Sequence, residues 1–137
     1  MNQSIKFCFA AALGSFVFAT GAQAHHSFAE FDKTKQSSVA GTVKYFEFTN
    51  PHVWVWLTVP GTGPQAGLWG FESGGPSQFD RMGISRSTFA PGTQLTITFH
   101  PLRDGRKGGD LMTAKFPNGD VIDIKKQVKI FANGEVQ

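Results

Sequence analysis

Apolar and polar side chains alternate along several segments of the chain after residue 36. Within 37–48 (SSVAGTVKYFEF), Val43 and Tyr45 fall on one side, and threonine and lysine fall on the other. Residues 94–100 (QLTITFH) alternate in the same way. A period of two is typical of a β-strand, because successive side chains point to opposite faces of a sheet. β-branched and aromatic residues predict further strands at 53–59, 68–73, 111–116 and 121–124.

Turn signals separate these segments. Glycine, proline and asparagine gather at Asn50-Pro51, in the loop 60–67 and at Pro91-Gly92. Between the last two predicted strands stands Asn118-Gly119, the strongest short hairpin signal. It predicts a type I′ turn, in which both residues have positive φ.

One segment, 74–83 (GGPSQFDRMG), differs in kind. Pro76 suits a first helical turn and Gly83 suits the position after a helix, so a short helix is predicted over 76–82. The order is then three strands, one helix, and two or three strands. It predicts an all-β domain: a small OB-fold-like Greek-key barrel of five to six strands, with the helix between strands three and four. A plain β-sandwich is the alternative, but it does not explain the position of the helix.

The first 24 residues have the parts of a secretory signal peptide. Lys6 precedes an apolar run at 7–19, and the segment ends Ala22-Gln23-Ala24. A membrane anchor is the alternative, but a spanning helix needs about 20 apolar residues. We therefore expect cleavage before His25 and a periplasmic or secreted protein. Cys8 lies too early in the apolar run to be a lipid-attachment cysteine.

Removal of residues 1–24 from 137 leaves 113, enough for one β-barrel domain at 25–137. Within it, 25–38 is expected to be an extended lead-in and 125–137 a partly loose tail. The domain has no cysteine, which excludes thiol nucleophiles, thiolate metal sites and disulfides. It carries 12 basic and 10 acidic side chains, a net charge of +2. This mild charge and the expected export argue against a nucleic-acid partner.

Several motifs together resemble one known family. They are HHSFAEFD at 25–32, GTV at 41–43, TNPH at 49–52, HPLRDG at 100–105, and the glycine pair of RKGGD at 106–110. On these motifs the chain, from His25 to about Ile124, resembles a family of small exported bacterial proteins catalogued as domain of unknown function 6152. The resemblance implies a compact, β-rich periplasmic protein, and it implies no activity, cofactor or substrate.

All four histidines, His25, His26, His52 and His100, follow the expected cleavage site. Cleavage would give His25 a free α-amine, which can chelate a metal ion together with its own ring Nδ1. A further imidazole, from His26, His52 or His100, would complete a T-shaped set of three nitrogens, which suits copper. His52 and His100 are predicted at strand ends, where side chains can converge at a barrel rim. The sequence therefore predicts a copper-binding exported protein.

Two alternatives to copper stay open. The imidazoles could be solvated or bonded to neighbouring carbonyl groups without any metal. Zinc would suit three histidines joined by a carboxylate such as Asp32 or Glu47.

A second hypothesis, a non-metal binding module, rests on Trp54 and Trp56. Residues two apart in a strand share a face, and the aliphatic face formed by Val53, Val55 and Leu57 is the better core candidate. The tryptophans would then lie on the outer face, where they could stack on a small flat ligand or a sugar, or contact a partner protein. The alternative is that the lead-in segment 28–31 covers them as a second small core.

The segment 102–110 is rich in glycine and cations and could bind an anion through backbone amides and Arg103. It lacks the spacing of a phosphate-binding loop and no helix follows it, so an ordinary hairpin loop is the alternative. Glu72 precedes the predicted helix and Asp80 lies within it, and nothing in the sequence pairs them as acid and base. No nucleophile elbow is present either, so no enzyme is predicted, except one that depends on a metal.

Overall fold

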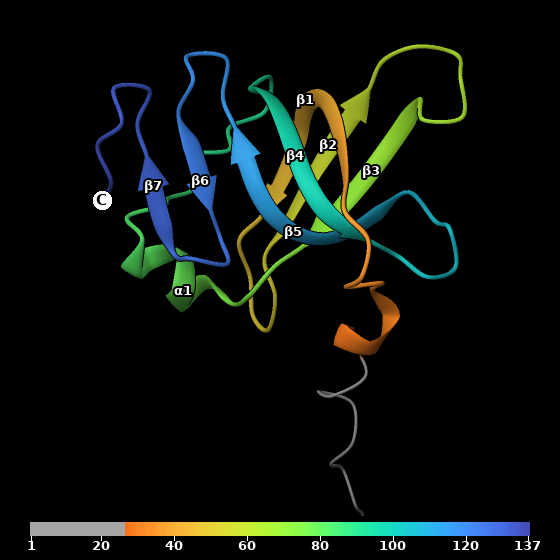
Figure 1. The fold of residues 1–137 in the computed structure, drawn as a ribbon, viewed down its shortest axis with the longest axis horizontal. Helices are drawn as coiled ribbons and strands as arrows, with labels where there is room; N and C mark the ends of the chain where they lie inside the picture. The colour runs from red at the N-terminus through yellow and green to blue at the C-terminus, as the bar shows by residue number, and fades with distance from the viewer. Residues whose placement is uncertain (1–26) are drawn as a thin grey trace, which may run out of the picture.

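The computed structural model describes residues 27–137, and Figure 1 shows them. The predicted signal peptide, its cleavage site, His25 and His26 lie outside the described residues. The elements are η1 (Ser27–Glu30), β1 (Ser37–Glu47), β2 (Trp54–Val59), β3 (Gly67–Glu72), α1 (Pro76–Arg81), β4 (Gln94–Pro101), β5 (Gly108–Lys115), β6 (Val121–Asp123) and β7 (Val128–Ile130).

Five strands close into a mixed barrel. Hydrogen-bonded neighbours run β3-β2-β1-β4-β5, and a parallel pairing between β3 and β5 joins the two ends. Around the barrel the order is therefore β1-β2-β3-β5-β4, with α1 between β3 and β4 in sequence. This is the Greek-key arrangement of an OB-fold, so the fold prediction is confirmed. β6 and β7 extend the sheet beyond β5 (Figure 1).

The barrel interior is aliphatic and aromatic. Val53, Val55 and Leu57 are completely buried, which confirms that the aliphatic face of β2 points inward. Other large side chains with at most 1% exposure come from the remaining barrel strands, from α1 and from the segment between α1 and β4, among them Phe71, Phe79, Phe89, Ile97, Phe99 and Leu111.

Helix α1 has the predicted ends. Pro76 occupies the first turn and Met82 is the C-cap. Gly83, with φ of +62°, donates its N–H to the Asp80 carbonyl at 2.9 Å. Glycine suits this position because a left-handed residue ends the helix at no steric cost. The helix thereby directs Phe79 into the core, where it has no exposed surface.

β5 begins three residues earlier than predicted, because Gly108, Gly109 and Asp110 are strand rather than loop. A Cβ on Gly108 would overlap the carbonyl oxygen of Gly70, and a Cβ on Gly109 would overlap that of His100. The two glycines therefore let β5 approach β3 and β4 closely enough to close the barrel. Their residue type, typical of loops, hides this role in the sequence.

The hairpin between β5 and β6 forms, but its predicted turn type is wrong. Of Asn118 and Gly119, only Gly119 has positive φ, at +95°. Its N–H donates to the Phe116 carbonyl at 3.0 Å, which makes a three-residue turn that begins with Pro117. Proline fixes φ near −65°, which suits the first corner of a type I turn followed by one left-handed residue.

Replacing Asn118-Gly119 by Val-Val is expected to lower the free energy of unfolding by about 2 kcal/mol. A valine at 119 would be strained at φ of +95°, and its Cβ would lie 3.1 Å from that of Ala132. The Asn118 side chain would also lose its bond from the Asp120 N–H, at 3.0 Å. Urea unfolding measures the loss, and Gly119→Val alone should account for most of it. An unchanged melting temperature would contradict this turn.

The two ends of the domain are more regular than expected. The tail forms β7, and Lys129 and Gln137 exchange two backbone hydrogen bonds of 2.9 Å. In the lead-in, η1 is a short 3-10 helix rather than an extended segment. Phe31 then makes an isolated bridge to Leu102, which attaches the lead-in to the end of β4.

Candidate functional site

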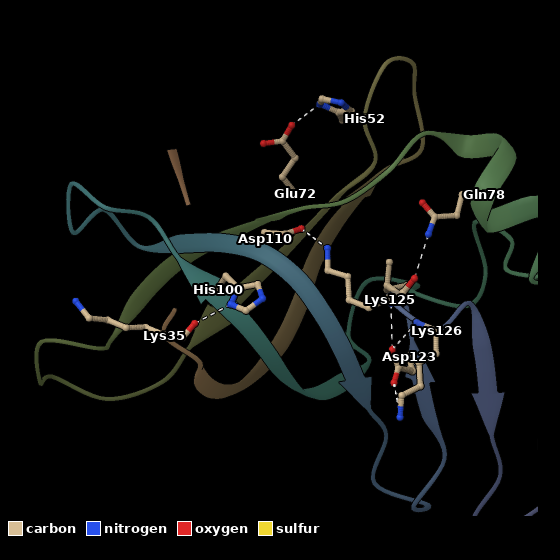
Figure 2. Close-up of polar contacts among 10 residues, drawn as sticks. Lys35, His52, Glu72, Gln78, His100, Asp110, Asp123, Lys125 and Lys126 are labelled. Atoms are coloured by element: carbon tan, nitrogen blue, oxygen red, sulfur yellow. Dashed lines mark hydrogen bonds and ion pairs between the residues drawn. The ribbon is translucent and has the colours of Figure 1, made fainter. Parts of the chain in front are cut away.

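His52 and Glu72 form a close pair at one end of the barrel. His52 lies between β1 and β2, and Glu72 is the last residue of β3. Backbone bonds join the two segments: Val53 N–H to Gly74 O at 3.0 Å, and Ser73 N–H to Val53 O at 2.9 Å. The His52 Nδ1 contacts the Glu72 Oε1, and the carboxylate is only 9% exposed (Figure 2).

This pair sets the tautomer of His52. An ionised carboxylate can only accept a hydrogen bond, so the proton of a neutral His52 ring lies on Nδ1. The nitrogen that carries the lone pair is then Nε2. A carboxylate behind a histidine ring is the arrangement that orients many metal-binding histidines and raises their basicity as ligands.

His100, on β4, has the same tautomer for a different reason. Its Nδ1 lies 2.7 Å from the carbonyl oxygen of Lys35, which can only accept. Nε2 therefore again carries the lone pair. Figure 2 shows His100 turned toward Lys35, apart from His52 and Glu72, which face each other.

The strand register connects the two histidines through buried acids. His100 pairs with Asp110, Asp110 with Glu72, and Glu72 with Trp54. Directly paired residues point to the same face of a sheet, so these side chains line one row on the outside of the barrel. Asp110 is 3% exposed and binds the Lys125 Nζ at 2.6 Å. Lys125 supplies the positive charge that a buried carboxylate requires.

Within residues 27–137, no three histidine, cysteine, aspartate or glutamate side chains form a group that could hold a metal ion. The predicted copper site would therefore depend on His25 or His26, which lie outside this range. Neither carboxylate considered for zinc belongs to such a group. Glu47 is exposed, and Asp32 serves a local turn.

Asp32 accepts a hydrogen bond from the Thr34 hydroxyl at 2.6 Å and forms an ion pair with Lys35 at 3.1 Å. The Thr34 hydroxyl, followed by Lys35, lowers the pKa of Asp32 to about 2. This carboxylate is therefore charged at neutral pH and committed to the turn that leads into β1.

Trp54 and Trp56 lie on the outer face of β2, as predicted, and their rings are 5.6 Å apart with an interplanar angle of 19°. Tyr45 of β1 extends the stack, at 5.5 Å and 29° from Trp56. We call these three residues the aromatic strip. The tryptophans are half-buried and Tyr45 is 36% exposed.

The sequence pattern placed Tyr45 on the same side as Val43, and this is wrong. The register with β2 shifts between Val43 and Tyr45, so that Val43 pairs with Leu57 and Tyr45 with Trp56. Such a β-bulge inserts one extra residue, here Lys44, and reverses the alternation beyond it. The bulge is what adds Tyr45 to the strip, and no turn residue signals it.

Arg103 attaches the lead-in to the barrel. Its backbone N–H donates to the Glu30 carbonyl at 2.8 Å, and its Nε donates to the Ala29 carbonyl at 3.2 Å. The loop around it joins β4 and β5 as a hairpin. The Nε that was considered for an anion thus has a partner within the chain.

The family model for "Family of unknown function (DUF6152)" matches residues 14–112, which is more than half of the chain. The chain belongs to this family. Membership confirms the resemblance noted in the sequence and brings no activity with it. No curated protein and no solved structure matches the chain. Across residues 27–137, no helix has the length and apolar character needed to cross a membrane.

Proposed function

We propose that the protein is exported, is cleaved before His25, and binds copper through the new N-terminal histidine together with His52. The observation that carries the metal proposal is the His52–Glu72 pair. A buried carboxylate holds the Nδ1 of His52, so that Nε2 is the ligand nitrogen. His100 has the same tautomer and is the alternative partner of His25.

The attachment of the lead-in supports this proposal. Asp32 and Arg103 anchor it through the bonds Asp32 N–H to Pro101 O and Arg103 N–H to Glu30 O, both 2.8 Å. Pro101 and Arg103, which make these bonds, follow His100 closely in the chain. His100 is one end of the row of outward-facing side chains that continues through Asp110 to Glu72. His25 is four residues before Ala29, and four residues span at most about 14 Å. The amine of His25 therefore lies no farther than about 14 Å from Ala29, which Arg103 binds at this end of the barrel.

The donor set favours copper. The α-amine and Nδ1 of His25 would form a chelate, and the His52 Nε2 would add a third nitrogen, a set that suits copper(II). The amine is released only by cleavage, so the complete site would form only after export. When bound, copper would supply a redox-active or Lewis-acidic centre, and His52 and Glu72 would hold its third ligand in place.

Adding three glycines before His25, which leaves no histidine within the first three residues, is expected to weaken copper binding by more than about 100-fold, since even the loss of a second-shell partner costs about 10- to 100-fold. The native protein should be purified from the periplasm without an N-terminal tag, and its intact mass should correspond to residues 25–137. Competition with a chelator then gives the affinity. His25→Ala should match the glycine-extended protein, and His26→Ala, the neighbouring control, should lose less.

Equal copper affinity in the native, glycine-extended and His25→Ala proteins would contradict the proposal. The second candidate function would then be the better account. That function is a metal-independent binding module, favoured by the half-exposed aromatic strip on the outer face of β2. Strands 2 and 3 of OB-folds present the face that commonly binds ligands.

A further inference from the structure

The aromatic strip has a flat floor provided by β3. Trp56 pairs with Gly70, and a Cβ at position 70 would come within 2.6 Å of the Trp56 ring. The absence of that atom lets the indole lie against the backbone of β3. One face of the ring is thus supported by the sheet.

Trp56 is poorly explained as packing alone. Its Nε1 is buried and has no hydrogen-bond acceptor within the described part of the chain. A buried donor without a partner destabilises a fold, and an aliphatic side chain would cover the same backbone without this penalty. A large indole placed here despite that penalty indicates that the ring surface itself is used.

Carboxylates border the strip. Trp54 pairs with Glu47 of β1 on one side and with Glu72 of β3 on the other. The exposed Glu47 offers hydrogen-bond acceptors beside the rings, and the carboxylate of Glu72 is mostly buried against His52. An apolar ring surface with acceptors at its margin complements a sugar ring, whose C–H face is apolar and whose rim carries hydroxyl donors.

We propose that the aromatic strip binds an uncharged oligosaccharide, with sugar rings stacked on Trp54 and Trp56 and hydroxyl groups donating to Glu47. This inference rests on the second candidate function and names its ligand class. OB-fold faces commonly bind oligosaccharides or oligonucleotides, and the charge of the face distinguishes between these two ligands. Glu47 places an exposed acidic group beside the strip, while Glu72 and Asp110 are buried against His52 and Lys125. A polyanionic nucleic acid gains affinity chiefly from cations that contact its phosphates.

The test uses the full exported protein treated with a chelator, so that copper plays no part. Chitotetraose and cellotetraose are titrated while tryptophan fluorescence is recorded, and calorimetry gives the affinity. Saturable binding of at least one oligosaccharide is expected. Trp54→Ala should weaken it about tenfold, and Trp54→Phe, which keeps an aromatic ring, should weaken it less.

Two further variants separate stacking from folding. Gly70→Ala keeps every ring but adds the Cβ that would displace Trp56, so it should weaken binding about as much as Trp54→Ala. Leu68→Ala is the matched control: Leu68 is 39% exposed on the same strand and lies outside the strip. Its affinity should equal that of the native protein. If Trp54→Ala does not fold, as judged by circular dichroism, Tyr45→Ala and Trp54→Phe replace it.

Three results would overturn the inference. Equal oligosaccharide affinity in the native, Trp54→Phe, Tyr45→Ala and Gly70→Ala proteins would place binding elsewhere. Binding of a single-stranded oligothymidylate, but of neither sugar, in a manner that depends on Trp54 would keep the binding face and reject the saccharide. Binding of none of these probes would reject the saccharide and remove the support for the second candidate function, while the copper proposal would stand.

Discussion

Replacing Gly109 by alanine is expected to destabilise the barrel by about 3 kcal/mol or more, the upper range for forcing extra atoms into a packed site. The new Cβ would overlap the carbonyl oxygen of His100 and lie 2.6 Å from the Phe99 ring. A flexible side chain could move aside, but the His100 backbone belongs to the β4–β5 ladder and cannot move without breaking it. Because β5 closes the barrel against β3, the damage should extend beyond the local contact.

Gly105→Ala is the matched control, four residues earlier in the preceding loop. Gly105 has φ of +78°, but a Cβ there would meet no atom within 4 Å. An alanine should therefore bear only the strain of the left-handed conformation, about 1–2 kcal/mol. Urea unfolding followed by circular dichroism compares the two variants. If Gly109→Ala were no less stable than Gly105→Ala, the close approach of β5 to β4 would be contradicted.

Gly108 and Gly109, the two glycines at the start of β5, show what the sequence alone does not predict. Alternation between apolar and polar residues is local, so β2 and β4 could be identified from their own residues. The ends of α1 could be predicted equally well, because Pro76 and Gly83 affect only the backbone within a few residues of their own positions. The pairing of Gly108 with Gly70 joins residues 38 positions apart, and no local pattern distinguishes it from a flexible loop.

Tyr45 shows a second kind of limit. A bulge changes the face of every residue after it, and its position is set by the register with the partner strand. The sequence therefore predicted the outward faces of Trp54 and Trp56 but missed the third ring of the strip. The tail was missed for a similar reason: β7 becomes recognisable only once β6 offers an edge for pairing.

The candidate site, too, could be predicted from the sequence only in part. His52 and His100 could be singled out because histidines are few and both fall at strand ends. Glu72 was visible in the sequence, but nothing there pairs it with a base. Its partner comes from a different loop, and the backbone bonds that join Val53 to Ser73 and Gly74 bring the two together. The orientation of the imidazole, which decides what His52 can bind, is therefore a property of the fold.

Replacing Glu72 by alanine is expected to weaken copper binding by about 10- to 100-fold, as is typical when a metal-binding histidine loses the group behind it. Without the carboxylate, the His52 ring could adopt either tautomer and rotate away from its ligand geometry. Affinity is measured by competition with a chelator. Nitrogen chemical shifts in the metal-free protein report the tautomer, which should change from Nδ1–H in the native protein to a mixture.

Two further variants give this prediction its specificity. Glu72→Gln keeps the shape and an acceptor oxygen but removes the charge, so its affinity should fall between those of the native protein and Glu72→Ala. Glu47→Ala removes an exposed carboxylate on the opposite side of Trp54 and should leave copper affinity unchanged. If Glu72→Ala altered the tautomer of His52 but not the copper affinity, His52 could not be the third ligand. His100, which the carbonyl of Lys35 orients independently of Glu72, would then be the imidazole to test with His25.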